Sequence, residues 1–208
     1  MADELVLYAN PMSRGRIARW MLEETGADYR TEVLDYATTM KGDAYLAINP
    51  MGKVPAIVHN GHVVTECAAI CAYLAEAFPE ADLAPTADER ADYYRWLFFA
   101  AGPLEQAVTN HYAKFEPSAD QGRMFGYGSY DQAVDTIERA VRAHPYIAGD
   151  RFTAADVYVG AAVGWGVQFG TLPKRDAFTD YFARLSSRDA YRRATEKDDA
   201  LMPAQQPA

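Results

Sequence analysis

The chain has 208 residues, enough for one or two domains with a sizeable hydrophobic core. Half of the residues are hydrophobic, an ordinary share for a globular protein. The formal net charge of −9 at pH 7 argues against nucleic acid and anionic membranes as partners. We find no signal-peptide pattern and no apolar run of membrane-spanning length, so the sequence predicts a cytoplasmic protein.

Strand and helix signals alternate in the first part of the chain. We expect a strand over residues 5–8, a helix from about Ser13 and a second strand over residues 31–34. This βαβ unit is followed by two more strands and a helix. Together they predict a mixed four-stranded sheet with helices on its faces.

Asn60-Gly61 indicates a hairpin between the apolar segments 56–59 and 62–65. Both residues of the favoured two-residue turn need a positive φ, which Asn and Gly tolerate. Pro55 opens the first strand and restricts Val54 to an extended conformation. If the Val54-Pro55 bond is cis, the Val54 N–H and C=O face outward and can pair with an extended peptide. The alternative is an ordinary proline on an edge strand.

A helix is predicted to begin after Glu66, because apolar residues recur at helical spacing at Ile70, Leu74 and Phe78. The first N–H groups of a helix are free and carry a partial positive charge, which attracts a carboxylate. Glu66 at that position would favour an ammonium group. An amino-acid end carries both groups and would satisfy both. The alternative is that Glu66 caps its own helix.

Cys67 and Cys71 are the only cysteines and lie on this predicted helix. Residues four apart on one helix do not suit a stable disulfide, which agrees with a reduced, cytoplasmic protein. Because no cysteine precedes Cys67, thiol exchange through a protein disulfide in the first turn is disfavoured.

The chain divides near residues 79–88, a stretch rich in proline, alanine and acids. Strand signals nearly vanish beyond it, and helices are predicted over residues 90–113, 127–143, 153–169 and 178–194. Thr153 and Asp156 have the spacing of a capping box, a folding signal to which we assign no catalytic role. The tail from Lys197 is expected to fray.

Several motifs along nearly the whole chain are similar to those of one family. They are LYANPMSRGRIARWMLEETG, YLAINPMGKVPAI, TECAAICAYLAEAFP, FTAADVYVG and FTDYFARLSSRDAYRRA. Through these motifs the chain resembles the cytosolic glutathione S-transferases, with a bacterial, serine-type site. The resemblance implies a thioredoxin-like α/β domain over residues 1–79. It also implies an all-helical domain over residues 89–208 that contributes the electrophile site.

The resemblance implies a catalytic role for Ser13, in the turn after the first strand. By itself, a serine there would predict only a helix N-cap. Several classes of the family place a serine in this turn, and its hydroxyl donates a hydrogen bond to the glutathione sulfur. Other classes use a tyrosine near the end of the first strand, so Tyr8 is the rival. Aligning on the Arg-Gly-Arg that follows brings Asn10, not Tyr8, to the place of that tyrosine.

The same resemblance implies a glutathione site. The backbone at Val54 and Pro55 would pair with the peptide, and Lys53 is similar to the position that holds the glycyl carboxylate. Glu66 and Cys67 would hold the γ-glutamyl group. Cys67 departs from the serine usual in the family. A thiol is the weaker donor, so binding should weaken rather than vanish.

Arg14 and Arg16 stand near a predicted helix start, where cations are mildly unfavourable. We expect them to pair with acids of the second domain. The alternative is that they steer an anionic substrate.

The expected function is glutathione transfer, in which the glutathione thiolate attacks a small hydrophobic electrophile and no metal takes part. Residues 110–115 are a candidate wall of the electrophile pocket. The family implies a homodimer that serves detoxification. One alternative is a glutathione-dependent disulfide reductase or peroxidase. The other is a non-catalytic interaction module on the same fold.

Overall fold

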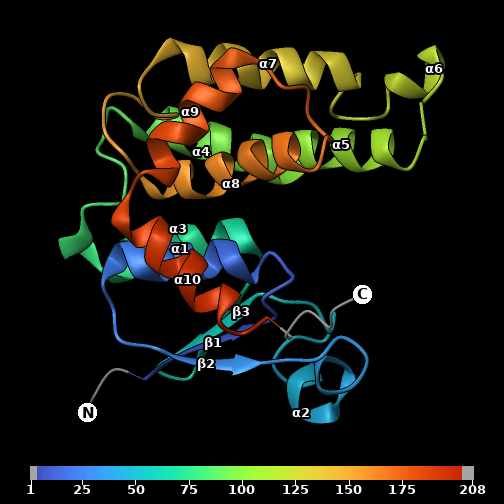
Figure 1. The fold of residues 1–208 in the computed structure, drawn as a ribbon. Helices are drawn as coiled ribbons and strands as arrows, with labels where there is room; N and C mark the ends of the chain where they lie inside the picture. Colours follow the sequence, from blue (N-terminus) through green and yellow to red (C-terminus); the bar gives the residue numbers. More distant parts are fainter. Residues whose placement is uncertain (1–3, 203–208) are drawn as a thin grey trace, which may run out of the picture. The chain divides into compact units, whose positions relative to one another are not determined.

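A computed structural model describes residues 4–202 and divides them into two compact units (Figure 1). The first unit joins residues 4–82 to residues 187–202, and the second runs from Leu83 to Ser186. The last helix therefore belongs to the first unit, whereas the sequence placed it in a helical domain over residues 89–208. The physical reason is a set of ion pairs with the first helix, described below.

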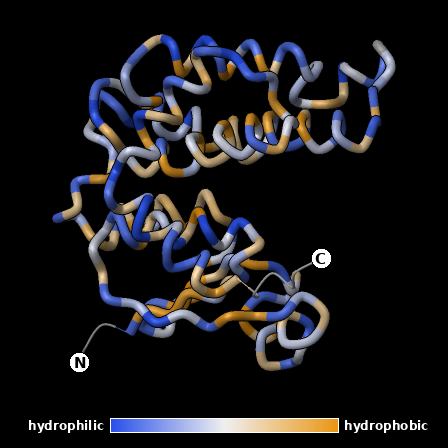
Figure 2. The backbone as a smooth tube through the Cα atoms, in the orientation of Figure 1, coloured by the Kyte–Doolittle hydropathy of each residue, from blue (hydrophilic) through white to orange (hydrophobic). Residues whose placement is uncertain are grey.

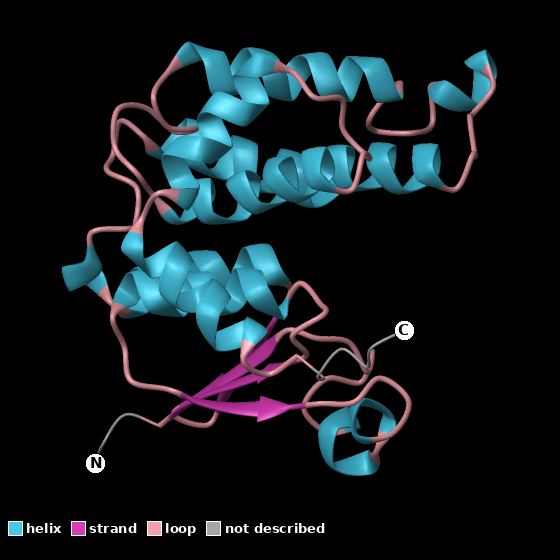
Figure 3. Cartoon of the chain, in the orientation of Figure 1, coloured by secondary structure: helices cyan, strands magenta, loops and turns pink. Residues whose placement is uncertain are grey.

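The first unit is built on the predicted mixed sheet, drawn in magenta in Figure 3. Its strands lie in the order β2-β1-β3-β4, with β1 parallel to β2 and antiparallel to β3. The strands are β1 (Leu5–Ala9), β2 (Arg30–Val33), β3 (Ala56–His59) and β4 (His62–Thr65). The hairpin is confirmed, with positive φ at Asn60 (51°) and Gly61 (81°).

Three helices cover one face of this sheet: α1 (Gly15–Thr25), α3 (Cys67–Ala77) and α10 (Asp189–Asp199) (Figure 1). Buried apolar side chains of α1 and α3 form the core beneath them, among them Trp20, Met21, Ile70 and Leu74. Figure 2 shows the hydrophobic strands in orange below the helices. The predicted apolar face of α3 is confirmed.

A smaller cluster packs on the opposite face of the sheet. Met40 and Tyr45 are both buried there, from the 3₁₀ helix η1 (Thr39–Lys41) and from α2 (Asp43–Leu46). Tyr8 packs against this cluster, with its ring centroid 5.6 Å from that of Tyr45. Side chains alternate along a strand, so Tyr8 and Ala9 point to opposite faces.

The second unit is helical in the part of the chain that the structure describes. Its central helix α8 is apolar on all sides and almost entirely buried, as the core helix of a bundle must be. Among the described residues, no helix is long and apolar enough to cross a membrane. The helices are α4 (Arg90–Phe99), η3 (Ala100–Leu104), α5 (Glu105–Tyr112), α6 (Ala119–Gly122), α7 (Tyr130–Ala143), α8 (Ala154–Gln168) and α9 (Asp176–Ser186). The short 3₁₀ helix η2 (Pro79–Ala81) lies in the first unit.

Two predicted helices differ in the structure. The helix expected over residues 90–113 contains a π-helical turn, η3, with Pro103 inside it. Proline has no N–H to donate and crowds the preceding turn, so the regular bonding pattern widens there.

The helix expected over residues 178–194 is two helices, α9 and α10, separated after Ser186. Serine side chains compete for backbone hydrogen bonds, which favours helix ends. The predicted fraying from Lys197 is wrong as far as Asp199, where α10 ends. Residues 200–202 form a turn and a bend, and residues 203–208 lie outside the described residues.

The capping box at the start of α8 is confirmed and is tied into the core. The buried Asp156 carboxylate accepts hydrogen bonds from the Thr153 N–H at 2.9 Å, the Ile147 N–H at 2.7 Å and the Tyr181 hydroxyl at 2.8 Å. The Thr153 hydroxyl also donates to it, at 3.1 Å. Burial raises the pKa of Asp156 to about 6, so the group is still ionised at neutral pH.

We predict that Asp156→Ala destabilises the protein by at least about 3 kcal/mol, because it leaves several buried donors without an acceptor. The measurement is the free energy of unfolding in urea. Asp150→Ala removes an exposed aspartate six residues away and should change stability by less than about 0.5 kcal/mol. Equal losses of unfolding free energy in the two variants would contradict the role of Asp156 as the acceptor for these buried donors.

Candidate active site

Three chain segments meet at one end of the sheet because of its strand register. Tyr8 pairs with Ala56, and Ala56 pairs with Thr65. The turn that follows β1, the residues that precede β3 and the residues that follow β4 therefore lie at the same end. These segments carry Ser13, Val54 and Glu66, respectively.

Asn10 organises the turn after β1. Its side-chain amide donates to the Leu34 carbonyl at 2.8 Å, and its side-chain oxygen accepts from the Met12 N–H at 2.9 Å. The Ser13 N–H donates to the Asn10 carbonyl at 3.0 Å. The turn is thus fixed to the end of β2 on one side and closes on itself.

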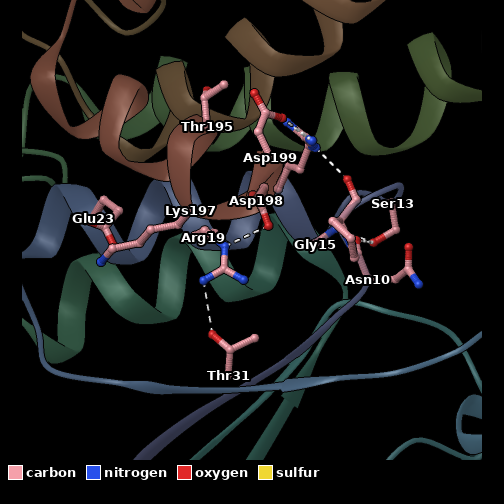
Figure 4. A network of polar contacts seen from close by, with 12 residues as sticks. Asn10, Ser13, Gly15, Arg19, Glu23, Thr31, Thr195, Lys197, Asp198 and Asp199 are labelled. Atoms are coloured by element: carbon pink, nitrogen blue, oxygen red, sulfur yellow. Dashed lines mark hydrogen bonds and ion pairs between the residues drawn. The ribbon is translucent and has the colours of Figure 1, made fainter. Parts of the chain in front are cut away.

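The Ser13 hydroxyl is half-buried and already has two hydrogen-bond partners. It donates to the Asn10 carbonyl at 2.6 Å and accepts from the Gly15 N–H at 2.9 Å (Figure 4). The predicted N-cap role is not confirmed, because the N-cap residue of α1 is Arg14, which makes no side-chain capping bond. A serine hydroxyl rotates freely to suit its acceptor, so it can turn its hydrogen toward a ligand while keeping the bond from Gly15.

Gly15 lets the turn approach β1 closely. A Cβ atom at this position would lie 2.7 Å from the Ala9 Cβ and 3.0 Å from the Ser13 Oγ. Any side chain here would push the serine away from the end of the strand, so the start of α1 requires glycine.

The Tyr8 side chain lies on the other face of the sheet from Ala9, which faces α1. It packs with Tyr45, whose hydroxyl donates to the Lys53 carbonyl at 2.5 Å. Burial raises the pKa of Tyr45 to about 12, which keeps this hydroxyl a donor. Tyr8 therefore belongs to the packing beneath the loop that precedes β3.

The Val54-Pro55 peptide bond is cis, as considered from the sequence. Within residues 4–202, the Val54 N–H and C=O have no protein hydrogen-bond partner. The adjoining loop is held firmly, because the Lys53 carbonyl also accepts from the buried Asn49 side chain at 2.9 Å. A rigid loop with a free strand-like peptide group suits pairing with an extended ligand.

Lys53 is exposed, and its ammonium group has no partner in the described part of the chain. A second lysine, Lys41, lies at the same loop and donates to the Gly52 carbonyl at 2.6 Å. The sequence analysis did not single out Lys41. The two lysines are twelve positions apart in sequence, and the fold of the segment between them brings both to one loop.

Glu66 has an unusual backbone conformation at the start of α3. Its φ of 63° and ψ of 113° lie outside the regions that a residue with a side chain adopts readily, at a cost of roughly 1–3 kcal/mol. Its side chain makes no capping bond to α3, so the alternative role as a helix cap is wrong. The first intrahelical bond runs from the Ile70 N–H to the Glu66 carbonyl, which leaves the N–H groups of residues 67–69 free for a ligand.

Cys67 joins the start of α3 to the turn after β1. Its thiol donates to the Arg14 carbonyl at 3.7 Å, a weak sulfur hydrogen bond. Cys71 lies one turn further along α3 and is buried. Contact with Cys67 and burial raise the pKa of the Cys71 thiol, which makes it an inert core residue. Both cysteines are reduced.

The described residues contain no group of three histidine, cysteine or acidic side chains that could hold a metal ion. This end of the sheet presents backbone N–H and C=O groups, the Ser13 hydroxyl, the Glu66 carboxylate and the Lys53 and Lys41 side chains.

The fold is that of a thioredoxin-like domain joined to a helical domain, and comparisons with known proteins agree. Residues 12–77 match the model of the glutathione S-transferase N-terminal domain. The glutathione S-transferase GST-4.5 of Xanthomonas campestris is 30% identical over 196 residues, covering 83% of this chain and 89% of that protein.

Two solved structures have the same fold. A glutathione transferase from Methylococcus capsulatus has a TM-score of 0.77 and 27% identity, over 94% of this chain and 99% of the other. A sphingomonad glutathione S-transferase complexed with glutathione has a TM-score of 0.75 and 26% identity, over 93% and 98%. The chain belongs to the glutathione S-transferase family and is an enzyme of that family.

We predict that glycine at position 66 gives a more stable protein than alanine, by about 1 kcal/mol. Glycine adopts a positive φ without strain, and this gain exceeds the roughly 0.4–1 kcal/mol that its flexible unfolded state costs. Glu66→Gly and Glu66→Ala both remove the carboxylate, so their free energies of unfolding in urea differ only through the backbone. An alanine variant that is equally stable or more stable would show that the conformation carries no strain.

Proposed function

We propose that the chain is a glutathione transferase that conjugates the thiolate of glutathione to small hydrophobic electrophiles. The observation that carries the proposal is the convergence of Ser13, Val54 and Glu66 at one end of the sheet. Each of the three segments offers unpaired or exchangeable groups that match one part of an extended γ-glutamyl tripeptide. Glutathione is then the co-substrate, and no metal takes part.

The γ-glutamyl end carries an ammonium and a carboxylate, and the start of α3 complements both. The exposed Glu66 carboxylate attracts the ammonium. The free N–H groups of Cys67 and the next two residues, at the positive end of the α3 dipole, bind the carboxylate. The Glu66 side chain makes no capping bond, so it does not occupy these N–H groups.

The remainder of the tripeptide follows the loop before β3. Its cysteinyl backbone pairs with the Val54 N–H and C=O as a short added strand, next to Pro55. Its glycyl carboxylate is attracted by Lys53, and Lys41 at the same loop adds a second positive charge. The ligand sulfur then lies toward the turn that carries Ser13.

One hydroxyl is enough to activate this sulfur. A free thiol has a pKa of about 8.5, so only a few per cent is thiolate at neutral pH. Lowering that pKa by about two units takes roughly 2.7 kcal/mol. A hydrogen bond to a charged acceptor contributes about 1.5–3 kcal/mol, and the N-terminus of α1 adds to it. The Gly15 N–H that donates to the Ser13 oxygen polarises the hydroxyl and strengthens it as a donor.

The second unit supplies the electrophile site and, in this proposal, part of a homodimer. It holds a pocket of about 600 Å³ at the ends of α5 and α8, lined by His111, Tyr112, Lys114, Glu116, Gly170 and Thr171. Three of these lie within the segment 110–115 singled out from the sequence. The enzyme would act on small apolar compounds in the cytoplasm, in detoxification.

We predict that Ser13→Ala raises the pKa of bound glutathione by about one to two units, toward its free value, because the hydrogen bond to the thiolate is lost. The measurement is the ultraviolet thiolate absorbance of the complex against pH. Tyr8→Phe is the control, since the Tyr8 ring packs with Tyr45 on the other face of the sheet.

If the pKa of bound glutathione rises in Tyr8→Phe but stays low in Ser13→Ala, the thiolate is stabilised by Tyr8 and not by Ser13. Failure of the wild type to bind glutathione would overturn the function itself and favour an interaction module. Turnover of mixed disulfides or hydroperoxides without turnover of aryl halides would favour the reductase or peroxidase.

We predict that Cys67→Ser tightens glutathione binding about two- to fivefold, because a hydroxyl donates to the γ-glutamyl carboxylate better than a thiol. Titration calorimetry gives the dissociation constants. Cys67→Ala keeps the backbone N–H and should bind within about twofold of the wild type. A serine variant no better than the alanine variant would show that the side chain takes no part in binding.

A further inference from the structure

The last helix, α10, is fixed on α1 by a network of charged side chains (Figure 4). At its centre, the Arg19 Nε donates to Asp198 at 2.7 Å, and both side chains are buried. Arg19 also donates to the Thr31 hydroxyl on the neighbouring strand at 3.0 Å. Glu23 of α1 makes two more ion pairs with α10, with Arg193 at 3.2 Å and with Lys197 at 2.5 Å. These ion pairs therefore fix the position of this end of α10 along the axis of α1.

This docking places Asp199 beside Arg16, one turn of α1 before Arg19. The Arg16 Nη2 donates to the Asp199 carboxylate at 2.6 Å. Through its Nε the same guanidinium donates to the Pro11 carbonyl at 2.5 Å. The planar guanidinium thus connects the end of α10 to the turn after β1.

Pro11 begins the short segment that ends at Ser13. Asn10 holds the turn to β2 from one side through the Leu34 carbonyl. Arg16 holds it from the other side through the Pro11 carbonyl. The turn also has bonds of its own, from the Ser13 N–H and the Ser13 hydroxyl to the Asn10 carbonyl, and the Tyr36 hydroxyl donates to the Met12 carbonyl at 3.3 Å.

We propose that Asp199 and Arg16 are positioning residues that fix the Pro11–Ser13 turn. Through them, α10 orients the Ser13 hydroxyl toward the ligand sulfur. The proposal rests on the proposed function, in which this hydroxyl stabilises the thiolate. Neither residue need touch the substrate. Asp199 orients the guanidinium, the guanidinium holds the Pro11 carbonyl, and the carbonyl fixes the turn that carries the hydroxyl.

The direction in which the pKa of bound glutathione shifts in Asp199→Ala distinguishes a positioning role from a direct charge effect. Removing the negative charge of Asp199 would by Coulomb's law favour a nearby thiolate and lower the pKa of bound glutathione. Loss of positioning weakens the hydrogen bond from Ser13 and raises that pKa. The two readings of the same substitution therefore predict opposite shifts.

The test compares Asp199→Ala with Asp189→Ala. Asp189 lies on the same helix, is exposed and pairs with Arg192 at 3.3 Å, so its removal changes the net charge equally. For Asp199→Ala we expect a pKa of bound glutathione raised by about half a unit and a kcat lowered about three- to fivefold, the size of effect for a half-exposed ion pair. The dissociation constant of glutathione should stay within about twofold, because β3 and α3 bind it. Asp189→Ala should leave all three values unchanged.

The double variant Ser13→Ala/Asp199→Ala tests whether Asp199 acts through the serine. If it does, the second substitution adds no further pKa shift to Ser13→Ala. Additive shifts, a lowered pKa in Asp199→Ala, or equal effects of both aspartate substitutions would each overturn the proposal. In any of these cases, the proposed function is still supported if the wild type binds glutathione with a lowered thiol pKa. Failure of the positioning role is therefore distinguishable from failure of the proposed function.

Discussion

The register of the sheet is the constraint on which the site depends. Tyr8 opposite Ala56, and Ala56 opposite Thr65, bring the ends of three strands to one place. A slip of one residue would turn every side chain of a strand to the other face and separate the segments that carry Ser13, Val54 and Glu66. The apolar face under α1 and the Tyr45 cluster on the opposite face both oppose such a slip. The two cores thus specify the geometry of the site as well as the stability of the domain.

The buried pair of Arg19 and Asp198 has a different role from the apolar cores. Burial raises the pKa of Asp198, against the pull of Arg19. Such pairs add little net stability compared with apolar packing, but separating the partners leaves a buried charge uncompensated. The pair therefore disfavours any placement of α10 that moves Asp198 away from Arg19. A helix distant in sequence becomes part of the first unit in this way.

Local signals in the sequence were sufficient for much of the fold. Asn60-Gly61 specifies the hairpin through its two positive φ angles, and the spacing of Ile70 and Leu74 specifies the buried face of α3. The mixed four-stranded sheet followed from the βαβ unit and the hairpin, whereas the strand order β2-β1-β3-β4 came from the structure. These predictions succeed because each depends on interactions among residues close in sequence.

Predictions that depend on distant residues fared less well. The assignment of α10 to the helical domain failed because its partners on α1 are about 170–180 residues away in sequence, as for Glu23 with Arg193. The Pro, Gln and Ala of the tail from Lys197 suggest fraying, and its sequence does not reveal that Asp198 pairs with the distant, buried Arg19. Lys41 was missed because an exposed lysine carries no signal without the fold of its loop. The segments of the candidate site could be found from motifs, but the bonds of the Ser13 hydroxyl could not.

Those bonds bear on how the proposed chemistry discriminates between thiol and thiolate. In the proposed site, the Val54 N–H and C=O and the N–H groups of residues 67–69 have no protein partners among the described residues, so a ligand displaces only water from them. The Ser13 hydroxyl instead donates to the Asn10 carbonyl at 2.6 Å, and it must give up that bond to donate to sulfur. A bond between neutral groups contributes about 0.5–1.5 kcal/mol and a bond to a charged acceptor about 1.5–3 kcal/mol. A neutral thiol, a poor acceptor, does not compete with the carbonyl, whereas a thiolate does. The hydroxyl therefore turns to the sulfur only when it is ionised, and an interaction made only with the ionised form is what lowers a pKa.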